Sequence, residues 1–332
     1  MENLALVGLR VLRGPDWAGG DEDGGEGHLG TVKEVLRNWH VRVLWDTGQE
    51  SICKAGAEGK TELRIFDTAA VGVHHSGSLC SSCGEKDIFG ALWSCVDCTT
   101  CDLCTTCYVL DEHDTDHCFY RLDFQNAPRV AVGQRKASVR LGAVGLLPGA
   151  RVRRGKDWAW GDQDGGQDSE GTLENYEEVG PLFKRALMRV RWVNGGTNIY
   201  RVGFKGNVDV VCIEEEARFF YYRDHLPCLG TGNFAGWNDE GIISYQAACS
   251  VHPDEGDGGI NSHDKDKRSR SALLETANGA EGGTDLPAKA EDISDVHPED
   301  SSVAQNEDCG KMTLSFEKLS TNKTERLWVL KN

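Results

Sequence analysis

The sequence predicts a mainly β protein in which two small β-barrel repeats flank a zinc finger and an acidic, disordered carboxyl-terminal tail follows. Three observations predict this class. Eight of the thirteen cysteines fall within Cys80–Cys118, similar text occurs on both sides of that cluster, and short apolar alternations are separated by glycine-rich turns. Glycine is abundant, with 40 residues, and proline is scarce, with 8, which favours tightly turned strands over a helical bundle.

The cysteine cluster contains three Cys-x-x-Cys pairs and, beyond them, two histidines. A Cys-x-x-Cys pair lets two thiolates reach one metal ion from a tight turn, and a structural zinc ion takes four such ligands. The eight candidate ligands are therefore enough for two closed sites. They are Cys80, Cys83, Cys95, Cys98, Cys104, Cys107, His113 and His117. Spacing alone leaves open which ligands share a metal ion, because Cys101 and Cys118 also lie in the cluster.

A similar stretch of sequence occurs on each side of the cysteine cluster. In both copies an Asp-Trp pair, ending in Trp17 or Trp158, is followed by acidic residues and a glycine pair, at Asp21–Gly25 and Asp162–Gly166. A glycine pair permits positive φ angles and aspartates hydrogen-bond nearby amides, while a tryptophan adds apolar area to a small core. We therefore interpret the repeated residues as structural. Calcium binding is the alternative, but the distal bidentate glutamate of a calcium loop is missing.

The strands expected in each copy are short and alternate in polarity. In the first copy they include Val41–Gly48, which ends in a hairpin turn, and Glu62–Phe66. In the second copy Met188–Gly196 corresponds to the strand that holds Trp45, and about six additional residues lie in Glu174–Arg185. Insertions of this kind belong in surface turns. Strands of this length and spacing predict a small barrel for each copy.

The net charge of −17 argues against a nucleic acid or an anionic membrane surface as partner, because both attract Lys and Arg. Fifteen acidic and five basic residues lie between Val251 and Gly310, a stretch without Phe, Trp or Tyr. Such a segment cannot bury enough apolar surface to fold, so we expect a disordered tail. No apolar run suits a membrane span and no signal-peptide core precedes Cys80. We expect no direct membrane insertion, and a reducing, cytoplasmic location rather than a disulfide-stapled extracellular module.

The cysteine cluster resembles a ZZ-type zinc finger over roughly Cys80–Leu122. Its ligands are accompanied, in the order typical of that family, by the aromatic residues Trp93, Tyr108 and Phe119. In that family the two sites interleave, an arrangement called cross-bracing. The resemblance therefore implies two zinc ions, one on Cys80, Cys83, Cys104 and Cys107 and the other on Cys95, Cys98, His113 and His117. Family members commonly carry an aromatic residue where this chain has Cys101, so a spare thiol stands there.

Two such repeats on either side of a ZZ finger resemble the amino-terminal module of the mind bomb family of RING ubiquitin ligases. The resemblance covers Val7 to about Gly230. It implies a first repeat at 5–71, the ZZ finger at 75–125, a linker at 126–144, a second repeat at 145–230 and a mostly disordered acidic tail at 231–332. Gly19 departs from the pattern, since the second copy has Trp160 at the matching position. The ankyrin repeats and the RING of that family are not recognisable in this sequence.

In the mind bomb family this module resembles a receptor for the cytoplasmic tails of the Notch ligands Delta and Jagged, which are then ubiquitinated and endocytosed. We therefore expect a substrate-recognition module that is non-catalytic by itself. An active ubiquitin ligase, with a ubiquitin-conjugating enzyme as partner of a full-length form, is the alternative. A hydrolase with Cys101 or another thiol as nucleophile would lack a free histidine base, because the nearby histidines are the implied zinc ligands. ZZ fingers elsewhere resemble receptors for peptide amino termini, which makes Asp102 a candidate peptide contact, together with Trp17, Trp158 and Trp160.

Two further segments each allow two interpretations. The connector Phe124–Pro148 is either a solvated basic linker or a positive strip that steers acidic or phosphorylated peptides toward the barrels. Its basic residues are Arg129, Arg135, Lys136 and Arg140. The stretch Asn233–Asn238 either packs back on the second barrel or is loose.

Overall fold

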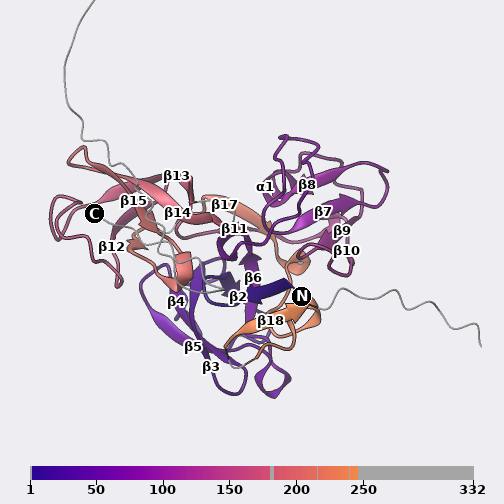
Figure 1. Cartoon of the computed structure of the whole chain (residues 1–332), viewed down its shortest axis with the longest axis horizontal. Helices are drawn as coiled ribbons and strands as arrows, with labels where there is room; N and C mark the ends of the chain where they lie inside the picture. Colours follow the sequence, from indigo (N-terminus) through magenta and orange to yellow (C-terminus); the bar gives the residue numbers. More distant parts are fainter. Residues whose placement is uncertain (1, 180–182, 215, 239, 246–332) are drawn as a thin grey trace, which may run out of the picture. The chain divides into compact units, whose positions relative to one another are not determined.

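The structure of the chain, a computed structural model, describes residues 2–179, 183–214, 216–238 and 240–245 (Figure 1). All of these belong to the first of two units of the chain, Met1–Asp257. The predicted mainly β class is confirmed, because the described residues form eighteen strands and one short α-helix, α1 (Thr105–Val109). The tail predicted to be disordered lies outside the described residues from residue 246 onward. None of the described helices is long and apolar enough to cross a membrane.

The first repeat is an antiparallel sheet of five strands in the order β5-β4-β3-β2-β6. Its strands are β2 (Arg10–Arg13), β3 (Gly30–Leu36), β4 (His40–Trp45), β5 (Glu50–Lys54) and β6 (Leu63–Asp67). The edge strands β5 and β6 meet at one end, where the Glu62 amide donates to the Lys54 carbonyl at 2.9 Å. The sheet therefore closes on itself at that end, as the strands of a small barrel do. Its core includes the buried side chains of Val11, Val43 and Trp45.

The second repeat has the same strand order, β15-β14-β13-β12-β16. Its strands are β12 (Arg151–Arg154), β13 (Gly171–Val179), β14 (Phe183–Trp192), β15 (Thr197–Arg201) and β16 (Val210–Cys212). The Asp209 amide donates to the Arg201 carbonyl at 2.9 Å, which is the counterpart of the closing contact in the first repeat. Equal strand order and equal closure show that the two stretches of similar sequence adopt the same fold.

The acidic turns make the same contacts in both repeats. The carboxylates of Asp23 and Asp164 are fully buried. Arg13 donates to Asp23 at 2.7 Å, and Arg154 donates to Asp164 at 2.5 Å. Each carboxylate also accepts an N–H from the glycine pair that follows it, at 2.9 and 3.1 Å. These contacts support the structural interpretation of the repeated residues, because each acidic turn is fixed by its own arginine.

The extra residues of the second repeat lengthen its β13–β14 hairpin. Arg185 on β14 donates to the Phe89 carbonyl at 2.6 Å, and its Nε lies 2.8 Å from the Asp67 carboxylate. Phe89 lies between the first Cys-x-x-Cys pair and the strand β7 (Leu92–Cys95), whereas Asp67 ends β6. The expected surface turn is thus wrong at Arg185, which is largely buried and ties the second repeat to the first repeat and to the finger. The tip, residues 180–182, lies outside the described residues.

The two repeats also touch through the β4–β5 turn of the first. Leu44 is buried within the core cluster of the second repeat, and the Asp46 carbonyl accepts the Cys212 amide at 2.8 Å. The matching residues of the second repeat are Arg191 and Val193. The side chain of Arg191 is 65% exposed, and Val193 as a whole residue is 78% exposed. The same face is therefore buried in the first repeat and left open in the second.

Six short 3-10 helices complete the described part: η1 (Ala57–Gly59), η2 (Ala69–Val71), η3 (Arg135–Ala137), η4 (Phe204–Gly206), η5 (Arg223–His225) and η6 (Gly232–Phe234).

A four-stranded sheet in the order β10-β9-β7-β8 supports the finger. Its strands are β7 (Leu92–Cys95), β8 (Asp102–Cys104), β9 (Phe119–Leu122) and β10 (Val130–Val132). Trp93 stacks on Tyr108 with ring centroids 3.8 Å apart, and Phe119 meets Tyr108 edge to face at 5.1 Å. All three aromatic residues are buried, so they contribute large apolar side chains to a core too small to rely on aliphatic side chains.

The segment expected to be a linker, 126–144, contains two strands. β10 joins the finger sheet, and β11 (Arg140–Ala143) pairs with β17 (Phe219–Tyr222), which follows the second repeat. Between them Arg135 is buried, with 1% of its surface exposed. A solvated linker and an exposed positive strip are therefore both wrong at Arg135. Lys136, in contrast, keeps 67% of its side chain exposed.

The residues that follow the second repeat return to the first repeat (Figure 1). Phe234 is fully buried in the core of the first repeat, and Trp237 lies against Trp39 with ring centroids 4.5 Å apart. The strands β1 and β18 pair antiparallel and so add backbone hydrogen bonds to this contact. These strands are β1 (Glu2–Ala5) and β18 (Ile242–Tyr245). The expectation that Asn233–Asn238 packs on the second barrel or is loose is wrong, and the predicted disorder is wrong for the described residues between 231 and 245.

Candidate metal centres

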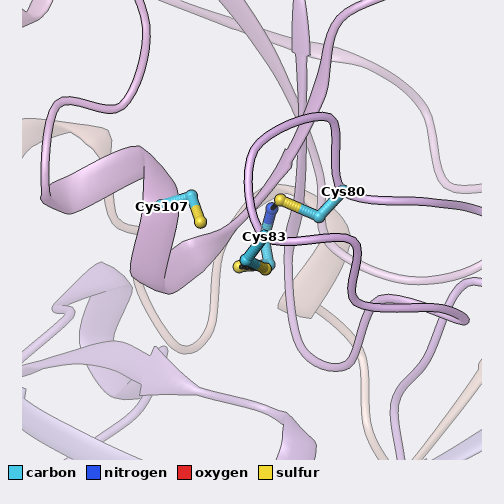
Figure 2. A group of neighbouring side chains, drawn as sticks. Cys80, Cys83 and Cys107 are labelled. Carbon is cyan, nitrogen blue, oxygen red and sulfur yellow. Dashed lines mark hydrogen bonds between the residues drawn. The ribbon is translucent and has the colours of Figure 1, made fainter.

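Four cysteine thiols gather where the loop from Cys80 meets helix α1 (Figure 2). Cys107 lies on the helix, Cys104 immediately precedes it, and Cys80 and Cys83 come from the loop. The four sulfur atoms lie within 4.8 Å of one another, and those of Cys83 and Cys104 are 3.8 Å apart. Cys83 is exposed and the other three are buried. The structure thus brings together the four ligands that the resemblance implies for the first zinc ion.

Backbone N–H groups favour the ionised form of Cys80. Burial acts to raise its pKa, but the N–H of Cys104, 3.3 Å from the sulfur, and those of Cys83 and Ser82 bring the pKa of the thiol down to about 7. Burial raises the pKa of Cys107 to about 11 and raises that of Cys104 further. Because the thiolate is the form that binds a metal ion, an ion bound here must displace these protons.

Two cysteines and two histidines form a second group. Cys95 ends β7 and Cys98 follows it, whereas His113 and His117 lie in the loop between α1 and β9. The four ligand atoms lie within 4.8 Å of one another. Cys98 Sγ is 3.5 Å from His117 Nδ1 and 3.6 Å from His113 Nε2, and Cys95 Sγ is 3.6 Å from His117 Nδ1. This set matches the one implied for the second zinc ion.

The distances between ligand atoms test whether each group fits a tetrahedral zinc ion. With Zn–S of about 2.3 Å and Zn–N of about 2.0 Å, the ligand atoms should be about 3.8 Å apart for two sulfurs, about 3.5 Å for sulfur and nitrogen, and about 3.3 Å for two nitrogens. The structure gives 3.8 Å for a sulfur pair, 3.5 and 3.6 Å for sulfur and nitrogen, and 3.0 Å between His113 Nε2 and His117 Nδ1. Both donor sets therefore fit a closed zinc site, with the two histidines slightly closer than ideal.

The two groups interleave along the chain, and the finger sheet is the reason. β7 pairs with both β8 and β9, so the ends of these strands bring distant ligands together. Cys101 belongs to neither group. Its Sγ lies 3.6 Å from Nδ1 of His113, while Nε2 of the same ring faces Cys98. Burial raises the pKa of the Cys101 thiol. A neutral thiol at this place can orient the histidine ring, but it is a poor nucleophile, which argues against the hydrolase.

The four candidate peptide contacts lie in three different parts of the chain. Trp17 and Trp158 occupy matching places in the two repeats, where each donates its indole N–H to a turn carbonyl, at 2.8 and 2.9 Å. Each also meets a buried core tryptophan edge-on. Trp160 packs against the second core, and its Nε1 is buried without a partner among the described residues. Asp102 begins β8 in the finger. The structure therefore does not bring all four into one site, and the tryptophans stabilise their own repeats.

A buried polar network that sequence reasoning missed joins the finger to the segment after the second repeat. Tyr108 Oη and Ser138 Oγ each lie 2.7 Å from one ring nitrogen of His225. Arg121 pairs with Asp123 at 2.6 Å and donates to the His225 carbonyl. Burial lowers the pKa of His225 to about 4, so the ring is neutral near pH 7. No local sequence pattern predicts this network, because its members come from segments far apart in the chain.

The comparisons with known proteins agree with this architecture. The Mib_herc2 domain family matches the chain twice, over residues 8–67 and 149–214, which are the two five-stranded repeats. Two such repeats around a cross-braced Cys/His finger place the chain in the class of proteins with Mib_herc2 domains. The chain is 42% identical over 224 residues to the E3 ubiquitin-protein ligase mind-bomb of Drosophila melanogaster, and 40% identical over 231 residues to the E3 ubiquitin-protein ligase MIB2 of Gallus gallus. It belongs to the mind-bomb family.

Both of these alignments cover 68% of this chain, but only 18% and 24% of the relatives. The chain therefore spans less than a quarter of the length of these curated relatives. A third relative, the E3 ubiquitin-protein ligase HERC2 of Mus musculus, is 42% identical over 66 residues, which is 20% of this chain and 1% of that protein. A match of that length corresponds to one repeat.

Proposed function

We propose that the chain is the zinc-binding, substrate-recognition module of a mind-bomb-like ubiquitin ligase. It binds cytoplasmic peptide tails of Notch ligands of the Delta or Jagged type for ubiquitination and endocytosis, and it is non-catalytic by itself. The observation that carries the proposal is a pair of four-ligand groups held between two Mib_herc2 repeats. Relatives that share this region are named E3 ubiquitin-protein ligases.

Zinc has a structural role in this proposal. Four protein ligands complete a tetrahedral shell, so neither group leaves an open position for a reacting molecule. A finger of this size has too small an apolar core to be stable without metal, and zinc binding supplies the missing free energy. The first ion would be held by Cys80, Cys83, Cys104 and Cys107, and the second by Cys95, Cys98, His113 and His117.

A cytoplasmic location is part of the proposal. All eleven cysteines among the described residues are free, including several outside the two metal groups. Thiols persist in this form in a reducing compartment, where zinc rather than disulfides stabilises small domains. The cytoplasmic tails of membrane proteins are accessible from that compartment, which fits the proposed partner.

Metal analysis and peptide binding test the proposal on the same sample. The purified chain should carry two zinc ions per molecule by native mass spectrometry. Fluorescence anisotropy should then show saturable binding of labelled Delta-type or Jagged-type tail peptides, and a scrambled tail of equal composition is the control. A two-zinc protein without affinity for any such tail would overturn the proposed partner, and fewer than two zinc ions would overturn the metal sites.

The names of the relatives favour a second function, ubiquitin transfer by a longer form of the protein. An autoubiquitination assay with a panel of ubiquitin-conjugating enzymes separates the two. We expect no transfer by the chain alone, because the ligand spacing of its finger resembles that of a ZZ finger and not that of a RING. Transfer by the chain alone would replace the non-catalytic proposal.

A further inference from the structure

The loop that carries both histidines of the second metal group contains no strand or helix. It runs from Leu110 to Cys118, between α1 and β9. A loop of this kind lacks the hydrogen-bond ladder that fixes ligands on a strand or helix, so its backbone groups need partners elsewhere. Those partners decide how firmly His113 and His117 are held before an ion binds.

The connector after the finger supplies these partners. Arg135 Nη2 donates to the carbonyls of His113, at 2.7 Å, and of Asp114, at 3.0 Å. The carbonyls of the next two residues accept hydrogen bonds from the Lys136 amide at 3.2 Å and from the Gln134 side chain at 2.6 Å. Four consecutive carbonyls of the histidine loop are therefore held by three consecutive residues of a different segment.

Arg135 is the central member of this contact. Its side chain has 0% exposure, and its Nη1 donates to the Tyr108 carbonyl at 2.7 Å. The guanidinium also lies over the rings of Tyr108 and Phe119, 4.9 and 5.1 Å from their centroids. A planar cation held by aromatic faces and carbonyl oxygens has little freedom to move. Because Tyr108 is on α1 and Phe119 begins β9, Arg135 joins both ends of the histidine loop to its middle.

Lys136 offers a matched contrast in the adjacent position. Its side chain is 67% exposed, and its ammonium group lies 3.1 Å from the exposed carboxylate of Asp116. Exposed ion pairs of this kind contribute little to stability. The backbone N–H of Lys136 bonds to the loop whatever side chain it carries. Replacing the lysine side chain therefore removes a positive charge from the same segment without touching the carbonyl contacts.

We propose that Arg135 is a positioning residue for the second metal group. It fixes the His113 backbone so that Nε2 of the ring faces Cys98 before an ion binds. The first group takes no ligand from the histidine loop, so it should depend on Arg135 far less. This inference rests on the proposed zinc sites, and it makes the connector part of the finger. Residues that support a ligand without touching the metal commonly change affinity by about 10–100-fold.

The test compares the full chain with the variants Arg135→Met, Arg135→Lys and Lys136→Met. Each is loaded with zinc, and the release of metal to increasing concentrations of a chromophoric chelator is followed. In Arg135→Met one of the two ions should leave at a chelator concentration at least about tenfold lower, while release of the other is unchanged. Arg135→Lys should lie between this variant and the unaltered chain, and Lys136→Met should match the unaltered chain.

Cobalt substitution identifies which site is affected. A site with two sulfurs and two nitrogens has weaker thiolate-to-cobalt charge-transfer absorption than a four-sulfur site, so the two can be followed separately. Selective loss of the sulfur–nitrogen site in Arg135→Met is the expected result. Unchanged release from both sites, or equal weakening of both, would overturn the inference. If Arg135→Met does not fold, Arg135→Lys decides by the same criterion. Fewer than two zinc ions in the unaltered chain would instead remove the proposed sites on which the inference rests.

Discussion

Arg10 and Asp46 form a buried ion pair at the contact between the two repeats. Arg10 Nη1 donates to Asp46 Oδ1 at 2.8 Å, and the second nitrogen meets the second oxygen, so the pair is bidentate. The same carboxylate accepts the amide of Leu146 at 2.6 Å, at the entry to the second repeat. At the matching positions of the second repeat stand Arg151, whose side chain is 53% exposed, and the exposed Val193. The exposed Arg151 of the second repeat is therefore a control, within the same chain, for the buried Arg10 of the first.

Replacing Arg10 by Met should destabilise the protein by about 3–5 kcal/mol, because the Asp46 carboxylate would stay buried without its cation. Replacing Arg151 by Met should change the free energy of unfolding by about 0.5 kcal/mol or less, because Arg151 forms an exposed ion pair. Urea denaturation followed by tryptophan fluorescence measures both. Equal losses in the two variants would contradict a special role for the buried pair.

Removal of metal should loosen the finger and spare the repeats. The repeats have cores of their own, each with a buried tryptophan, whereas the finger depends on its two ligand groups. After chelation, amide hydrogen exchange should become fast across residues 80–119 and stay slow in β3, β4 and β14. Serine replacements at Cys95 and Cys98 should reproduce the loss around the second ligand group, and replacement of Cys228, outside both groups, should not. Uniform loss of protection over all three parts would contradict this expectation.

The free energy of unfolding should decrease as the pH is lowered, because of His225. Burial lowers its pKa to about 4, with Asp224 opposing the change and Arg121 and Arg135 adding to it. In the unfolded chain a histidine titrates near pH 6.5, so the unfolded state binds more protons between pH 6.5 and pH 4. The folded state is therefore fully favoured above about pH 6.5, and about 3 kcal/mol is lost progressively as the pH falls to about 4.

The measurement compares unfolding of the unaltered chain and of His225→Gln at several pH values. The variant should be less stable at pH 7, because Tyr108 and Ser138 lose their partner, but the gap should narrow by about 3 kcal/mol toward pH 4. His75, which is also buried with a pKa of about 4, should remain as a second source of acid sensitivity in this variant. A gap that is independent of pH would contradict the assignment.

Gly19, which stands where the second repeat has Trp160, lies directly against the ring of Trp17. A Cβ added there would lie 2.6 Å from the ring of Trp17. That ring cannot easily move, because it donates to the Gly20 carbonyl and meets Trp45 edge to face at 5.4 Å. Gly19→Ala should destabilise the first repeat by about 1–3 kcal/mol. Gly133→Ala is the control, since nothing lies within 4 Å of its added Cβ, and thermal unfolding of both variants checks the difference.

Local patterns predicted the parts of the molecule that depend on local chemistry. Cys-x-x-Cys spacing identified the candidate ligands, and the resemblance implied the same two groups that the structure brings together. The Asp-Trp and glycine-pair motifs indicated turns, because Asp23 and Gly25 act within a few residues of each other. The alternation of short apolar segments indicated the strands of each repeat, but the order in which they pair is seen only in the structure.

The parts that were missed depend on partners that are distant in the sequence. The sequence around a buried arginine such as Arg135 does not differ from that around a solvated one. Its partners are backbone carbonyls, which every residue type provides. Phe234 and Trp237 lie in a stretch expected to pack on the second barrel or to be loose, and no local pattern indicates that they pack on the first repeat.

The return of the chain to its first repeat has a practical consequence for any shortened form of the protein. Ending it after the second repeat, near Gly230, would remove Phe234 from the core of the first repeat and β18 from its pairing with β1. The first repeat would then be destabilised although the chain is shortened after the second, and a test of the second repeat alone would not detect this loss. A shortened form that keeps residues through Tyr245 retains both contacts.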